Sequence, residues 1–157
     1  MALDGLLLKQ SIKPLQAKLP LKIHRIYHLS ENEVLFQLKD AREKIQLLFS
    51  CHSVHNRLQL TTREFVTPQE PTNFVMLLRK HCEESIILSL NQVGLDRVIE
   101  IKISQRNALG DVNNTRLMIE LMGKYANLIL VDDQGKILDA LKRIPPYENT
   151  KRTLQPV

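Results

Sequence analysis

The apolar residues near the start of the chain recur at the spacing of an amphipathic helix. Residues three or four apart share one face of a helix. The set comprises Leu3, Leu6, Leu7, Leu8, Ile12, Leu15 and Leu19. Pro14 lies inside this stretch. Because proline has no amide hydrogen, we expect Pro14 to kink the helix or to begin a second short one.

The next part of the chain contains short runs rich in apolar residues and separated by polar connections. The runs cover residues 22–29, 34–38, 45–50 and 58–62. Glu31-Asn32 is suited to a turn between the first two runs. Short strands with polar connections of this kind predict an antiparallel meander.

A second helix is predicted after this meander. Pro68 and Pro71 bracket a loop, and Thr72 directly precedes an apolar-periodic stretch. A threonine side chain can accept a hydrogen bond from an amide of the first helical turn, so Thr72 is suited to cap a helix over residues 73–81.

Four further strands are expected beyond this helix, at residues 86–93, 97–104, 117–121 and 127–131. Gly94 turns the first into the second, residues 107–114 form a polar loop, and Asp133-Gln134-Gly135 is a turn into the apolar segment 137–141. Two helices and about eight short strands, mostly antiparallel, predict an α+β fold, namely a β-sandwich with two segregated helices.

The length of 157 residues suits one domain with an ample core. We expect the domain to span residues 1–146, with residues 147–157, after Pro145-Pro146, as the start of a linker. No stretch approaches the roughly 20 apolar residues of a membrane span. The N-terminal region lacks the order of a signal peptide, so we expect a cytoplasmic protein.

Positive charge is concentrated at the two ends of the chain. Residues 1–28 carry five Lys and Arg residues against Asp4 alone, and residues 136–152 carry five against two acidic residues, within a net charge of +5. If the two ends meet in the fold, they form a positive patch suited to phosphates. A solvated surface with chance clustering is the other interpretation. The chain has no Trp and few aromatic residues, which counts against a base-stacking single-strand binder.

An acidic and a basic residue, Asp96 and Arg97, follow Gly94 closely. Successive strand residues point to opposite faces, so the two side chains reach one ligand only at a strand end or bulge. The Arg guanidinium pairs with a phosphate or a base edge, and a carboxylate accepts from the amino groups of unstacked bases. The pair therefore suits recognition of an exposed RNA loop. An intramolecular ion pair that closes the turn is the alternative.

Four segments carry a family resemblance by their order and spacing: residues 2–6, 77–82, 92–101 and 120–132. With them, the chain resembles the NFACT-N domain, which opens the bacterial RqcH proteins, also described as fibronectin-binding proteins of the FbpA and PavA type, and their eukaryotic NEMF relatives. The resemblance implies a β-sandwich similar to the N-terminal domain of formamidopyrimidine-DNA glycosylases. It also implies further domains beyond this chain.

The resemblance implies a function in ribosome-associated quality control. RqcH proteins bind a stalled large ribosomal subunit carrying peptidyl-tRNA and recruit alanyl-tRNA, so that the nascent chain gains a C-terminal alanine tail. In this family the pair matching Asp96-Arg97 is implicated in engaging tRNA, and so is an Asp at the place of Asp4, which is also suited to cap the first helix. We therefore expect a module that binds tRNA and the large ribosomal subunit.

Three basic residues are further candidates for phosphate contacts. Arg79 and Lys80 follow each other on the second predicted helix, where neighbouring side chains fan around the axis and only some can face one partner. Lys124 follows Gly123 in the segment Lys124-Tyr125-Ala126-Asn127, where the family commonly has Arg-His-Ser-Asn. Tyr125 and Ala126 depart from that pattern.

Catalysis and metal binding have little support in the sequence. The chain has no Gly-rich phosphate loop and no nucleophile elbow. The glycosylases use an N-terminal Pro followed by Glu, whereas Ala2-Leu3 occupy those places here, which disfavours a residual glycosylase activity. Cys51 and Cys82 lack the paired spacing of a zinc site and fit reduced, buried thiols. We expect no enzymatic activity, no metal and no cofactor.

An alternative function of another class is an anchorless adhesin that binds fibronectin at the cell surface without a signal peptide. The older family name records this function. The sequence contains nothing that resembles an extended fibronectin-binding repeat, although its basic charge could support binding to an acidic matrix.

Overall fold

The computed structural model describes residues 5–40, 44–51, 57–61, 70–94, 96–121 and 126–142. These residues form two helices and nine strands, which confirms the predicted α+β class. The elements in chain order are α1 (Gly5–Gln16), β1 (Leu21–Ser30), β2 (Glu33–Lys39), β3 (Lys44–Ser50), β4 (Arg57–Thr61), α2 (Asn73–Cys82), β5 (Ser85–Gln92), β6 (Val98–Arg106), β7 (Val112–Glu120), β8 (Asn127–Asp132) and β9 (Ile137–Ala140). Within the described ranges, neither helix is long and apolar enough to cross a membrane.

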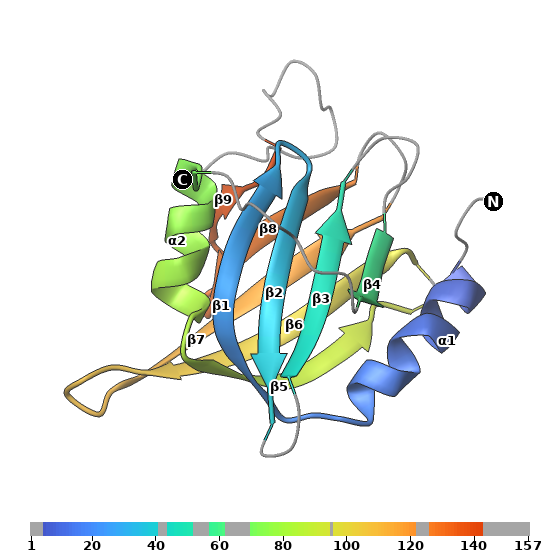
Figure 1. The fold of residues 1–157 in the computed structure, drawn as a ribbon. Helices are drawn as coiled ribbons and strands as arrows, with labels where there is room; N and C mark the ends of the chain where they lie inside the picture. The colour runs from blue at the N-terminus through green and yellow to red at the C-terminus, as the bar shows by residue number, and fades with distance from the viewer. Residues whose placement is uncertain are drawn as a thin grey trace.

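All nine strands belong to one antiparallel sheet in the order β4-β3-β2-β1-β5-β6-β7-β8-β9. The sheet folds back on itself, so that β1–β4 lie in front of β5–β9 and form a second layer (Figure 1). The fold occurs where β1 meets β5, since these strands pair only from Leu21 to Ile23. The predicted sandwich is therefore confirmed, and its two layers come from one continuous sheet.

The core fills the space between the two layers. In β6, Ile99, Ile101 and Ile103 are buried, whereas Glu100 and Lys102 lie on the opposite face, as the alternation of the sequence predicts. Full burial of an aliphatic side chain contributes about 1.5–3 kcal/mol relative to an exposed one. The repeated burial of Ile, Leu and Phe from both layers therefore holds the folded sheet closed.

Helix α1 covers one end of the sandwich with the apolar face that its periodicity predicts. Leu8, Ile12 and Leu15 are buried. Pro14 does not begin a second helix, which was one of the two predictions for it: α1 continues through Pro14 and ends at Gln16. A proline so close to the C-terminus removes only one backbone hydrogen bond, and packing against the sheet outweighs that loss. The Gln16 Nε2 atom also donates to the carbonyl oxygen of Leu90, over 2.6 Å.

The structure confirms the cap predicted for α2. Thr72 is extended, and its hydroxyl oxygen accepts a hydrogen bond from the amide of Val75, over 3.3 Å. Phe74, Val75, Leu78 and Cys82 form the buried face of the helix.

One strand prediction needs correction. Strand β7 begins at Val112 rather than residue 117, so the loop predicted over residues 107–114 is shorter. Asn113 and Asn114 instead pair with Gln105 and Ser104 of β6, in a hairpin that is exposed at its end and projects from the sandwich (Figure 1). Both faces of this part of the strand are exposed, so its residues are polar and the sequence lacks the apolar alternation by which a strand is recognised. The segment after Gly135 forms the additional strand, β9.

Candidate nucleic-acid interface

Asp96 and Arg97 lie in the tight turn that joins β5 to β6. The amide of Val93 donates to the carbonyl oxygen of Val98 over 2.9 Å, and the amide of Asp96 donates to the carbonyl oxygen of Val93 over 3.1 Å. Gly94 has a φ of +58°, a left-handed conformation that other residues adopt at a cost. Both residues therefore lie outside the regular strands, where the alternation of faces does not separate their side chains.

A side chain of β5 also supports this turn. The Gln92 Nε2 atom donates to the carbonyl oxygen of Asp96 over 2.7 Å. Asp96 is exposed and Arg97 is partly buried. The arrangement places an acidic and a basic residue at consecutive positions of a backbone held by several hydrogen bonds.

The turn shares its edge of the sheet with the end of β7. The amide of Leu121 donates to the carbonyl oxygen of Arg97 over 2.9 Å, and Val98 pairs with Glu120. The chain continues from Leu121 into the segment that contains Lys124. Lys124 itself and Asp4 lie outside the described residues, so their predicted contacts with RNA stay predictions.

Arg79 and Lys80 lie far from this turn. They belong to the last turn of α2, where the Gln105 Nε2 atom donates to the carbonyl oxygens of Lys80 and Glu83, each over 3.1 Å. Gln105 follows Arg97 by eight residues along β6, which corresponds to roughly 26 Å of extended strand. The candidate phosphate contacts therefore form a surface separate from the Asp96-Arg97 turn.

The Arg79 side chain is partly engaged inside the protein. Its Nε atom donates to the carbonyl oxygen of Ile26 over 2.9 Å, which fixes the guanidinium beside β1. Lys80 is exposed. Of these two candidates, Lys80 is therefore the one whose side chain is open to solvent.

The basic residues from the two ends of the chain do not form one common patch among the described residues. Lys22 lies at the start of β1 beside Glu84. The Lys142 Nζ atom donates to the carbonyl oxygen of Cys51 over 2.7 Å, and the Cys51 amide donates to the carbonyl oxygen of Asn32, beyond the far end of β1. The length of β1 separates these places, roughly 30 Å at the usual rise per residue.

Both cysteines are buried free thiols, as the sequence predicts. Burial raises the pKa of Cys82 to about 12 and also raises the pKa of Cys51, because a thiolate loses its hydration inside the core. Within the described parts of the chain, no group of three or more His, Cys, Asp or Glu residues could hold a metal ion.

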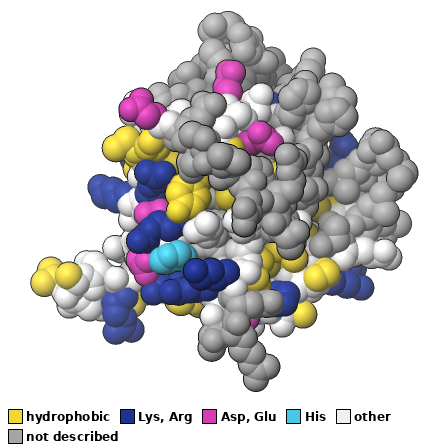
Figure 2. Space-filling view, in the orientation of Figure 1, with side chains coloured by type: hydrophobic (Ala, Val, Ile, Leu, Met, Phe, Trp, Pro, Cys, Tyr) yellow, Lys and Arg dark blue, Asp and Glu magenta, His cyan; other side chains and the backbone are white. Residues whose placement is uncertain are grey.

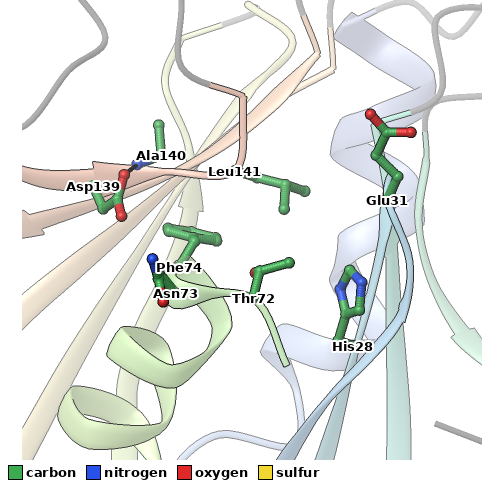
Figure 3. Close-up of a pocket in the computed structure, with 8 residues that line it drawn as sticks. All are labelled: His28, Glu31, Thr72, Asn73, Phe74, Asp139, Ala140 and Leu141. Carbon is green, nitrogen blue, oxygen red and sulfur yellow. Dashed lines mark hydrogen bonds between the residues drawn. The ribbon is translucent and has the colours of Figure 1, made fainter. Parts of the chain in front are cut away.

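The structure contains a cavity of about 540 Å³ that the sequence did not indicate. It lies between the end of β1, the start of α2 and the end of β9, and Figure 3 shows the eight lining residues, with His28, Thr72 and Asp139 among them. His28 and Asp139 are buried, although both are polar. They are 111 residues apart in the chain, so no local pattern could have predicted their approach.

A cluster around Glu84 is a second feature that the sequence did not indicate. This carboxylate contacts Lys22, His24 and Arg25 of β1. The sequence showed the basic residues only as part of a charge excess, and it offered no sign that one acidic residue from the α2–β5 connection gathers them.

Comparison with solved structures defines the class of domain. The N-terminal domain of the fibronectin-binding protein PavA from Streptococcus pneumoniae is similar over 98% of this chain and 58% of that chain, with a TM-score of 0.92 and 38% sequence identity. The chain is thus a folded-over antiparallel sandwich of the kind found in the N-terminal domain of PavA.

The family described as "NFACT N-terminal and middle domains" matches residues 4–157, and the chain belongs to this family. The chain is 37% identical over 158 aligned residues to the "Rqc2 homolog RqcH" of Streptococcus pneumoniae serotype 2, covering 99% of this chain and 29% of that protein. It is 27% identical over 150 residues to "Ribosome quality control complex subunit 2" of Saccharomyces cerevisiae, covering 94% of this chain and 13% of that protein. The chain therefore spans less than a third of the length of these relatives.

Proposed function

We propose that this chain is the RNA-binding module of a ribosome quality control factor and that its Asp96-Arg97 turn contacts tRNA. The observation that carries the proposal is the position of an adjacent acid and base in a hydrogen-bonded turn, outside both flanking strands. Membership of the NFACT family and the names of the relatives supply the biological setting.

Each residue of the turn has a defined role in this proposal. The Arg97 guanidinium offers planar donors to a phosphate or a guanine edge, and the Asp96 carboxylate accepts from an exocyclic amino group of an unstacked base. Gly94 and Gln92 hold the backbone of the turn, so little conformational freedom is lost on binding.

By family resemblance, the whole factor binds a stalled large ribosomal subunit in the cytoplasm and recruits alanyl-tRNA for alanine tailing of the nascent chain. The module needs no cofactor and performs no catalysis in this scheme, because the ribosome supplies the peptidyl-transfer chemistry. Asp4 and Lys124, which lie outside the described residues, are further candidates for contacts with tRNA by family resemblance.

The test is a fluorescence-anisotropy titration of this chain with tRNA and with an RNA duplex of matched size, at several salt concentrations. The variant is Asp96→Ala/Arg97→Ala. Its matched control is Asp133→Ala/Lys136→Ala, which removes one exposed acid and one exposed base from the β8–β9 turn.

A preference for tRNA that is lost in the Asp96→Ala/Arg97→Ala variant and kept in the control supports the proposal. Equal binding of both RNAs, with the same steep salt dependence in all three proteins, contradicts it, because sequence-independent phosphate contacts alone behave in this way.

Fibronectin binding is the second candidate, since the similar solved domain of PavA is described as part of a fibronectin-binding protein. The exchange Asp96→Arg/Arg97→Asp distinguishes the two functions because it keeps the net charge. Loss of the tRNA preference with unchanged fibronectin capture would assign the turn to RNA, whereas loss of fibronectin capture alone would favour the adhesin.

A further inference from the structure

A basic cluster lies where β1 meets the C-terminal end of α2. It comprises Lys22, His24 and Arg25 of β1, which contact Glu84, together with Arg79 and Lys80 from the last turn of α2. Figure 2 shows Lys and Arg side chains gathered beside a histidine and acidic side chains on this flank of the molecule. Its Lys and Arg residues are more numerous than its neighbouring acids, Glu83 and Glu84.

Glu84 occupies the centre of the cluster. Its Oε2 atom lies 2.6 Å from Lys22 Nζ, and its Oε1 atom lies 3.0 Å from Arg25 Nη1. His24 Nδ1 lies 3.5 Å from Glu84 Oε1, an ion-pair distance rather than a hydrogen bond. One carboxylate thus takes the position that a phosphate would take among three basic side chains.

A β-bulge explains how these three residues of β1 reach one carboxylate. In a regular strand, Arg25 would point to the face opposite Lys22 and His24. The register of β1 against β2 shifts between Ile23 and Arg25, so His24 is the extra residue on β1. A bulge bends its strand and redirects the side chains beside it, here onto a common side.

The backbone of Glu84 is held in place by β1. Its φ is +63°, a left-handed value that is uncommon for a residue other than glycine. The Glu84 amide donates to the carbonyl oxygen of Ile23 over 2.8 Å, and the Glu83 Oε2 atom accepts from the amide of Ile26 over 2.9 Å. The residues after α2 therefore hydrogen-bond to the edge of β1 beyond the point where its pairing with β5 ends. These hydrogen bonds hold the Glu84 carboxylate beside the basic residues.

Stability alone is a weak reason for this arrangement. The side chains of Lys22, Arg25 and Glu84 are 38%, 46% and 50% exposed. Ion pairs with this exposure are screened by water and salt and contribute little to folding. The same exposure keeps the basic groups accessible to an anion from solution.

We propose that the basic cluster is a second RNA contact, which binds the phosphate backbone, and that Glu84 weakens this contact by competing with phosphate for Lys22 and Arg25. This inference rests on the proposed RNA-binding function and adds a surface to it. The cluster adjoins Gln105 through the end of α2, so roughly 26 Å of strand β6 separate it from Arg97. One RNA could contact both places, with base recognition at the turn and charge neutralisation at the cluster.

Two pairs of variants of this chain test the proposal in the same anisotropy titration. Lys22→Ala/Arg25→Ala removes two positive charges from the cluster, and Lys44→Ala/Lys136→Ala removes two exposed positive charges elsewhere. Glu84→Gln removes the competing charge and keeps the side-chain size, and Glu31→Gln removes an exposed charge of the same kind from the β1–β2 turn. Circular dichroism confirms folding, and Arg25→Gln replaces the double variant if that variant is unfolded.

We expect Lys22→Ala/Arg25→Ala to bind tRNA and duplex RNA about 5- to 10-fold more weakly. The slope of log K against log salt should also become less steep by about 1–2, because fewer counterions are released on binding when phosphate contacts are lost. We expect Glu84→Gln to bind about 2- to 5-fold more tightly than Glu31→Gln. A cluster variant that matches its control in either pair overturns the proposal. If polyglutamate and RNA of matched charge displace the bound tRNA equally well, that result also overturns the proposal and assigns the cluster to an acidic protein partner.

The two RNA proposals fail in different ways. Loss of the tRNA preference in Asp96→Ala/Arg97→Ala, together with unchanged affinity in Lys22→Ala/Arg25→Ala, leaves the turn as a binding site and rejects the cluster. The reverse result rejects the turn and supports the cluster as a sequence-independent contact.

Discussion

The amide of Leu121 donates to the carbonyl oxygen of Arg97 over 2.9 Å and thereby joins two connections that are separated in the chain. One is the β5–β6 turn with Asp96, and the other begins directly after β7. The hydrogen bond ties the backbone of Arg97 to the end of β7, so the position of Arg97 depends on both connections.

Gly94→Ala should destabilise the protein through backbone strain alone. No atom lies within 4 Å of a Cβ atom at this position, but the φ of +58° is unfavourable for Ala. We expect a loss of about 1 kcal/mol, or about 2–4 °C in melting temperature for a chain of this size. Thermal denaturation measures the effect. Gly94→Asn should lose less, since Asn tolerates left-handed backbone; an equal loss in both variants would contradict this explanation.

Asn127→Ala should destabilise the edge of the sheet where β9 pairs with β8. The Asn127 side chain is fully buried, donates to the carbonyl oxygen of Lys142 and accepts from the amide of Lys142, each over 2.9 Å. Loss of these partners should cost about 2 kcal/mol, because the backbone groups of Lys142 lose their hydrogen bonds. Urea denaturation tests this value. The exposed Asn113→Ala is the control, and a loss no larger than in that control would argue against the role of Asn127.

The stability difference between the wild-type chain and Glu84→Gln should depend on pH. Hydrogen bonds and charge interactions with Lys22, and then with Arg25, lower the pKa of Glu84 from its ordinary value of 4.5. A carboxylate with a lowered pKa in the folded state contributes stability above its unfolded pKa, and this contribution is lost as the pH falls through the folded value.

The wild-type chain should therefore have a slightly higher urea midpoint at pH 6.5, as expected for exposed ion pairs, and this small difference should disappear in strongly acidic solution. A difference that persists at pH 2 would mean that the carboxylate charge is not its source.

Neither cysteine should react readily in the folded protein. Burial raises the pKa of Cys82 to about 12 and raises the pKa of Cys51, so at pH 8 few thiolates form and the reagent has no access to them. A colorimetric thiol reagent should detect little reaction in native buffer and both thiols in urea. Rapid reaction of a thiol in native buffer would show that it is less buried than the structure indicates.

The candidate site was predictable where its determinants are local. Gly94 lies two residues before Asp96, so the sequence could indicate a turn and a pair of side chains freed from strand alternation. The basic cluster was not predictable in this way. Its arrangement depends on a one-residue bulge in β1 and on the approach of Glu84, which lies 59 residues after Arg25 in the chain.

For the fold as well, local features were predictable from the sequence, and features set by long-range contacts were not. Apolar periodicity by itself determined α1, α2 and most strands, since burial of one face imposes a repeat on the residues of each element. The start of β7 and the continuation of α1 through Pro14 were decided by pairing and packing, which outweigh local preference. The folding of one sheet into two layers, and the separation of the turn from the basic cluster, also came only from the tertiary structure. Contacts between residues far apart in the chain set these distances, and such contacts leave no periodic signal in a single sequence.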